Sequence, residues 1–165
     1  MSEVLKIAII GDYNFTFNAH HATNLSLDHS SEFLEVELNY YWIKISEALK
    51  HKEGYFQQYD GIWVAPGPIE NPFYLNGIFK KIANKNIPVL ITGEGFKIFL
   101  EYLITQNQLL SQQEKLISEN LVSGNSFERI TIEPRTKAFR QLYKNFNTTE
   151  LSSSRYSLYP QLVEQ

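Results

Sequence analysis

The sequence predicts an α/β fold: a three-layer, doubly wound, mostly parallel sheet of flavodoxin-like architecture. An almost continuous apolar run from Val4 to Ile10 ends at Gly11, which is typical of a strand buried on both faces of a parallel sheet. Similar apolar runs alternate with stretches of helical periodicity, and this alternation favours a parallel sheet. The chain has 165 residues, of which 43% are hydrophobic, so its length predicts one domain over 1–165.

The elements follow in order along the chain. Asn18 is expected to cap the first helix, whose apolar face would include Ala22, Leu25 and Leu27. Beyond residue 105 the pattern weakens, and residues 106–125 are rich in polar side chains. The expected strands are 4–10, 35–43, 60–65, 88–92 and 130–132, and the expected helices are 19–33, 45–49, 72–86, 96–103, 112–117 and 138–145.

Composition excludes several classes of function. The net charge is −3 and the basic residues are scattered, so neither nucleic acid nor an anionic membrane is an expected partner. The apolar runs are too short for a transmembrane helix, and the N-terminus enters a strand pattern without a signal peptide. The chain has no cysteine, which excludes disulfides and a cysteine nucleophile. We expect a cytoplasmic protein without a cofactor.

Three segments are expected to meet at one edge of the sheet. They are residues 11–14, 66–72 and 93–95, each of which follows a predicted strand. In open parallel sheets, ligands bind at the carboxyl ends of the strands. The last segment, after the strand Pro88 to Thr92, has the pattern of a nucleophile elbow, a tight turn at which a helix begins. Here the exposed position of that turn is Gly93.

The same segments resemble class I glutamine amidotransferase domains, and more closely the C-terminal glutaminase region of CTP synthase and its stand-alone relatives. The matching stretches are KIAIIGDYN (6–14) followed by Ala19-His20, DGIWVAPGP (60–68), IPVLITGEGF (87–96), and Tyr156 to Pro160 in the tail. The resemblance implies the fold of that family, in which glutamine hydrolysis supports CTP synthesis in pyrimidine nucleotide biosynthesis.

The chain departs from the family pattern at the reacting groups. The alignment places Gly93 where the family has its nucleophilic cysteine and Glu94 where a backbone N–H serves the oxyanion hole. Gly67 belongs to the loop that gives the second donor, but Pro68 follows it and has no N–H. A late His-x-Glu segment is missing, so we expect a domain truncated at its C-terminus relative to the family. These departures predict an inactive pseudo-glutaminase.

Three hypotheses follow for what the chain does instead. The first is binding of a small polar metabolite or a partner protein, such as a second copy or a synthetase. The second is a hydrolase or transferase that uses Glu94, Asp12 and His20. The third is a structural or regulatory subunit whose pocket loops are filled by aromatic side chains such as Phe15, Phe17, Phe73 or Tyr74. The candidate pocket residues are Gly67, Pro68, Gly93, Glu94, Gly95, Asp12, Asn14 and His20.

A metal site is not expected. His20, His21 and His29 lie in the first predicted helix, where neighbours 20 and 21 point about 100° apart. No carboxylate completes a ligand set near them. The four tryptophan and tyrosine side chains at 40, 41, 42 and 63 are read as core and flank packing, because no basic residues alternate with them to bind nucleic acid.

Overall fold

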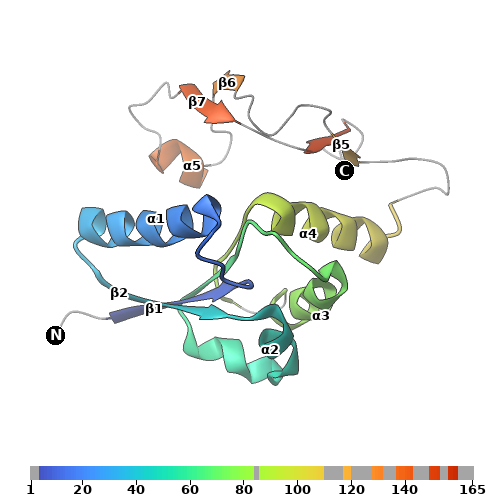
Figure 1. Cartoon of the computed structure of the whole chain (residues 1–165), viewed down its shortest axis with the longest axis horizontal. Coiled ribbons are helices and arrows are strands. Elements are labelled where there is room, and N and C mark those ends of the chain that lie inside the picture. Colours follow the sequence, from blue (N-terminus) through green and yellow to red (C-terminus); the bar gives the residue numbers. More distant parts are fainter. Residues whose placement is uncertain are drawn as a thin grey trace. The chain divides into compact units, whose positions relative to one another are not determined.

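The computed structural model describes residues 4–83, 86–109, 117–119, 128–131, 137–142, 149–152 and 156–159. The chain falls into two compact units, residues 1–109 and 110–165 (Figure 1). That the whole chain acts as one domain stays a prediction. Among the described residues, no helix is both long and apolar enough to cross a membrane.

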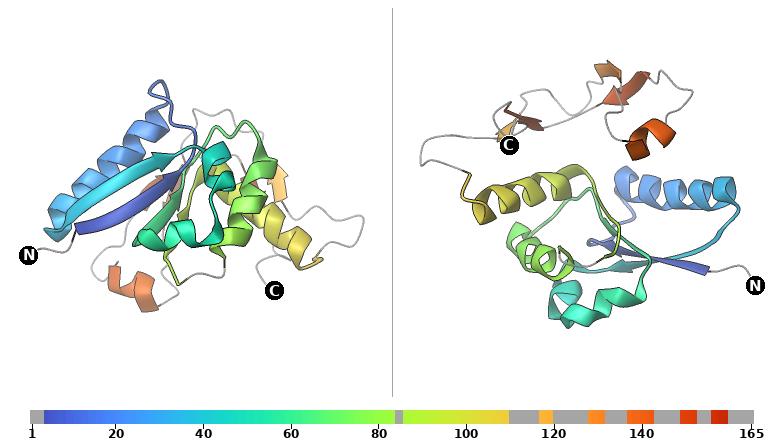
Figure 2. Two further views of the ribbon diagram at one scale, coloured as in Figure 1. Left: turned by 90° about the horizontal axis from the view of Figure 1, so that it is seen from below. Right: turned by 180° about the vertical axis from the view of Figure 1, so that it is seen from behind.

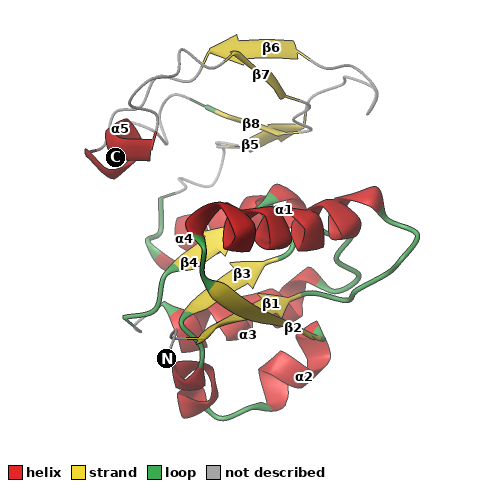
Figure 3. Cartoon of the chain, turned by 90° about the vertical axis from the view of Figure 1, so that its left-hand side faces the viewer, coloured by secondary structure: helices red, strands yellow, loops and turns green. Residues whose placement is uncertain are grey.

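The first unit is built on a four-stranded parallel sheet with the order β2-β1-β3-β4. Its strands are β1 (Val4–Ile10), β2 (Glu37–Ile43), β3 (Gly61–Val64) and β4 (Val89–Ile91). Its helices are α1 (Asn18–Leu34), α2 (Ile45–Lys50), the 3₁₀ turn η1 (Glu53–Gln58), α3 (Pro72–Ile82) and α4 (Gly93–Gln106). Helix α1 lies on one face of the sheet and α2 and α3 lie on the other (Figures 1 and 3). The predicted doubly wound parallel fold is therefore confirmed.

The main core lies between the sheet and the helices on the α2 and α3 face. Alternate residues of the central strands, among them Ala8 and Ile10, point into it. Helix α3 contributes Leu75, Ile78 and Phe79, all fully buried, at the helical spacing that the sequence shows. The ring of Phe79 also contacts two rings of α4, Phe99 and Tyr102, at centroid distances of 5.1 and 5.6 Å. These contacts fix α4, and with it the turn that precedes α4.

The expected apolar face of α1 was mostly wrong. Ala22 and Leu25 are exposed and Leu27 is half-buried, whereas the buried residues of the helix are His20 and Thr23. Polar side chains can occupy this stripe because their polar atoms are hydrogen-bonded: the Thr23 hydroxyl donates to the Ala19 carbonyl at 2.9 Å.

The expected cap of α1 was also wrong. Asn18 is the first helical residue, and Phe17 stands at the N-cap without a side-chain hydrogen bond. The loop before the helix is instead closed by backbone bonds, in which Phe17 N–H donates to the Asn14 carbonyl at 3.1 Å. A capping side chain is therefore not what begins this helix.

The other boundaries differ from the sequence prediction by a few residues. Strand β2 begins at Glu37 because Glu35 ends α1 in the left-handed region, with φ 52°. Helix α3 ends at Ile82, before the predicted 86. Helix α4 is longer than predicted, since it begins at Gly93 and runs to Gln106. The elbow glycine is thus the first helical residue.

In the second unit, the described residues form two short antiparallel pairs and one helix (Figure 2). Strand β5 (Ile117–Glu119) pairs with β8 (Tyr156–Leu158), and β6 (Glu128–Thr131) pairs with β7 (Thr149–Ser152). Helix α5 spans Lys137–Leu142. The predicted strand 130–132 and helix 138–145 are found as β6 and α5. The predicted helix 112–117 falls mainly outside the described residues, and its last residue begins a strand.

Candidate functional site

The predicted elbow is present between β4 and α4. Gly93 has φ +55°, a conformation that glycine adopts without steric cost. Thr92 precedes it in extended conformation, and its N–H donates to the Val64 carbonyl at 3.2 Å. The Thr92 hydroxyl accepts a hydrogen bond from the Trp63 indole N–H at 2.9 Å. Strand β3 therefore holds the turn in place from its own carboxyl end.

The elbow is closed by the backbone of Pro66. A Cβ atom placed on Gly93 would lie 2.5 Å from the Pro66 carbonyl oxygen and 2.8 Å from its Cα. The same carbonyl accepts a hydrogen bond from Glu94 N–H at 2.8 Å. In the family pattern this N–H faces a developing oxyanion. Here it is already paired, and the position above Gly93 leaves no room for a side chain.

The side chain of Glu94 holds the loop that closes the elbow. Its carboxylate accepts a hydrogen bond from Ile69 N–H at 3.0 Å. A Cβ atom at Gly67 would lie 2.6 Å from this carboxylate, and Gly67 has φ +102°. Glycine is therefore required at position 67 by both its conformation and the close approach of Glu94. The peptide bond between Gly67 and Pro68 is cis.

His20 joins the first segment to this loop. Its side chain is 1% exposed. Its Nδ1 accepts a hydrogen bond from Asn14 N–H at 2.9 Å, and its Nε2 lies 2.8 Å from the Gly67 carbonyl oxygen. An acceptor at Nδ1 and a donor at Nε2 define the neutral tautomer with the proton on Nε2. The rings of Tyr13 and Trp42 pack against the imidazole ring of His20, at centroid distances of 5.8 and 5.0 Å.

The structure thus brings most of the predicted pocket residues together. Asn14, His20, Gly67, Gly93 and Glu94 lie along one chain of hydrogen bonds and close contacts. The remaining three are Gly95, which is buried against β3, Asp12, which is half-buried, and Pro68, which is exposed.

Two of the three residues that the enzyme hypothesis requires are bonded to the backbone. One Glu94 carboxylate oxygen accepts a hydrogen bond from Ile69 N–H, and both nitrogens of His20 face backbone groups. Two described tyrosines, Tyr40 and Tyr59, have a pKa raised by burial, and neither is a predicted site residue. The hypothesis of a hydrolase or transferase stays a prediction.

Sequence reasoning missed Pro66, which is the residue that closes the elbow. The stretch Ala65-Pro66-Gly67-Pro68 shows a rigid turn. It does not show that a carbonyl of that turn points at residue 93, because the two positions meet only through the pairing of β3 with β4.

Metal ligands do not gather in the part of the chain that the structure describes, where no three His, Cys, Asp or Glu side chains form a group. His21 is exposed, and its Nε2 lies 2.6 Å from the Phe15 carbonyl oxygen. The neighbouring His20 is turned to the loop of Gly67 instead.

Exposed aromatic side chains follow the carboxyl ends of the strands. The third hypothesis expected such side chains to fill the pocket loops, but Phe15 and Phe73 are 75% and 81% exposed. Other exposed aromatic side chains lie on the β1–α1 loop and on the first turns of α3 and α4. We call this set the aromatic rim: Tyr13, Phe15, Phe17, Phe73, Tyr74 and Phe96.

Comparison with solved structures agrees with this fold. The glutaminase domain of Trypanosoma brucei CTP synthase, solved with bound acivicin, matches with a TM-score of 0.69 and 15% sequence identity. The match covers 97% of this chain and 71% of that chain. The chain has the fold of a CTP synthase glutaminase domain. No protein-family model matches the sequence, and no curated protein matches it either.

Proposed function

We propose that this chain is a catalytically inactive glutaminase-like domain that acts by binding a partner protein. The observation that carries the proposal is the position of the Pro66 carbonyl, which is bonded to Glu94 N–H at 2.8 Å. It pairs with the donor that the family uses for catalysis, and a side chain at the exposed Gly93 would clash with it. A retained fold with a closed elbow favours binding over chemistry.

The chemical groups of a glutaminase are missing from the same site. Glycine stands at the nucleophile position, and the chain has no cysteine that could replace it from elsewhere. The loop donor is lost at Pro68, which has no N–H. The one buried histidine of the site, His20, is bonded on both sides to backbone groups. Release of ammonia from glutamine by the purified chain would overturn this part of the proposal.

A partner protein fits the exposed surface better than a small metabolite at the elbow does. The Cβ position of Gly93 is taken by Pro66, whereas the side chains of the aromatic rim are exposed to solvent. Aromatic side chains are enriched at protein interfaces because each buries a large apolar area with few rotatable bonds. The metabolite remains the alternative, since the rim also borders polar groups such as Asp12.

Self-association gives a direct test, because a second copy is one candidate partner. We expect sedimentation velocity to show concentration-dependent dimerisation of the full chain, and Phe73→Ser to weaken it by about tenfold, the loss of one buried aromatic anchor. The matched control is Phe33→Ser on α1, a residue that is 86% exposed and lies outside the rim. A chain that stays monomeric at every concentration, or equal effects of the two variants, would contradict dimerisation through the rim.

A further inference from the structure

A second concave site lies between α3 and α4. Its cavity volume is about 350 Å³, and its lining includes Phe73, Asn76, Glu101, Tyr102 and Thr105. The elbow residues from 92 to 95 are not part of its lining. Phe73 is shared with the aromatic rim, but the other four residues were not predicted as a site. This groove is separate from the elbow, and Phe73 is the residue it shares with the surface of the proposed function.

The groove contains a buried polar atom with no partner. The side-chain oxygen Oδ1 of Asn76 is buried, and it makes no hydrogen bond within the described part of the chain. Buried carbonyl oxygens are nearly always paired, because an unpaired one loses its hydration without compensation. An amide oxygen accepts hydrogen bonds. A ligand that completes it must therefore offer an N–H or O–H group.

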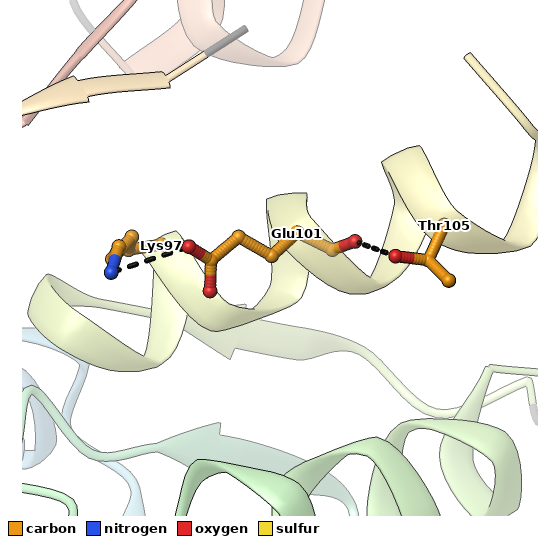
Figure 4. A network of polar contacts seen from close by, with 3 residues as sticks. All are labelled: Lys97, Glu101 and Thr105. Atoms are coloured by element: carbon orange, nitrogen blue, oxygen red, sulfur yellow. Dashed lines mark hydrogen bonds and ion pairs between the residues drawn. The ribbon is translucent and has the colours of Figure 1, made fainter. Parts of the chain in front are cut away.

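Glu101 brings a carboxylate to the groove. One carboxylate oxygen of Glu101 lies 3.2 Å from the Lys97 ammonium, and Figure 4 shows the other oxygen turned away from Lys97. The Thr105 hydroxyl donates to the Glu101 carbonyl at 2.9 Å, which leaves its oxygen lone pairs as acceptors. No lysine, arginine or histidine is among the described residues that line the cavity. The polar groups of the groove are thus mainly acceptors.

Aromatic rings complete the lining. Phe73 and Tyr102 border the same cavity, and Phe73 is largely exposed. The face of an aromatic ring attracts a cation that approaches it within about 6 Å. Ile98 adds an apolar surface at the base, where it is 4% exposed. A ligand with an apolar stem and a cationic head matches both kinds of lining.

We propose that this groove binds a small organic cation, a primary ammonium or guanidinium group on an aliphatic stem. The cationic head donates a hydrogen bond to the Glu101 carboxylate oxygen that is not paired with Lys97 and, once the Asn76 side chain turns toward the groove, a second one to the buried Asn76 Oδ1. The stem packs between Phe73 and Tyr102. The three acceptors, the rings and the lack of a lining cation all select the same ligand chemistry.

An NMR titration of the full-length chain with n-butylammonium chloride tests the proposal. We expect saturable shifts of the Asn76 side-chain amide and the Thr105 backbone amide, with a Kd on the order of millimolar for so small a ligand. n-Butanol at the same ionic strength has the same stem without the charge, and it should bind at least about fivefold more weakly. Equal binding of the two compounds, or no saturable shift at Asn76, would overturn the proposal.

Variants locate the binding. Glu101→Gln keeps the shape of the side chain and removes its charge, so it should weaken butylammonium binding by about fivefold. Asn76→Ala removes the unpaired oxygen and should also weaken it. Glu32→Gln is the matched control, because Glu32 is an exposed acid on α1 outside the groove. Unchanged binding in both Glu101→Gln and Asn76→Ala would show that the cation does not occupy this site.

Discussion

A Gly93→Cys variant will be less stable than the unmodified chain and will not gain glutaminase activity. The new Cβ atom would lie 2.5 Å from the Pro66 carbonyl oxygen and within 2.8 Å of two further Pro66 atoms. The backbone at residue 93 would also have to keep φ +55°, a conformation that costs a non-glycine residue about 1–3 kcal/mol. With the clash added, we expect a loss of at least about 2 kcal/mol. Urea denaturation measures the loss, and an ammonia assay measures the activity.

The matched control for this variant is Gly54→Ala. A Cβ atom at Gly54 meets only the Gln57 side-chain oxygen, at 3.8 Å, so the free energy of unfolding should change by at most about 1 kcal/mol. If Gly93→Cys were as stable as the unmodified chain, the loop of Pro66 would have to move away at little cost. That result, or release of ammonia from glutamine by the variant, would contradict a closed elbow.

A His20→Ala variant will be destabilised by about 3 kcal/mol. The substitution removes the partners of Asn14 N–H and of the Gly67 carbonyl, and each buried group left unpaired costs about 1–3 kcal/mol. It also leaves a cavity beside the rings of Tyr13 and Trp42. The free energy of unfolding from urea denaturation measures the effect.

His21→Ala is the control on the adjacent residue. His21 is exposed, and its hydrogen bond to the Phe15 carbonyl is at the surface, so we expect a loss below about 1 kcal/mol. Equal effects of the two substitutions would show that His20 does not tie the first loop to the loop of Gly67. A much larger effect of His20→Ala would agree with the two buried hydrogen bonds.

The sheet and the α3 core could be predicted because their signals are local. The apolar run of β1 and the spacing of Leu75, Ile78 and Phe79 each identify a buried surface without knowledge of the rest of the chain. The buried face of α1 could not be predicted in this way. His20 and Thr23 are polar, and the burial of His20 depends on a partner, Gly67, that lies 47 residues away in the sequence.

The elbow, too, could be predicted only in part from the sequence. Residues 92 to 95 predict the turn, and Gly93 indeed has a positive φ. The closure of the turn depends on Pro66, 27 positions earlier, through the pairing of β3 and β4. The departures from the glutaminase pattern were visible in the sequence as missing groups. That the Pro66 carbonyl pairs with Glu94 N–H could not be seen without the arrangement of the strands.

Hydrogen exchange at the Glu94 amide, followed by NMR in the unmodified chain, tests the closed elbow most directly. Thr92 N–H, which donates to the Val64 carbonyl of β3, is the internal reference. Because Glu94 N–H is bonded to the Pro66 carbonyl at 2.8 Å, its exchange should be slowed to a similar degree. Exchange of the Glu94 amide at the rate of an unstructured peptide would contradict the closure, since the N–H would then be open to solvent or ligand.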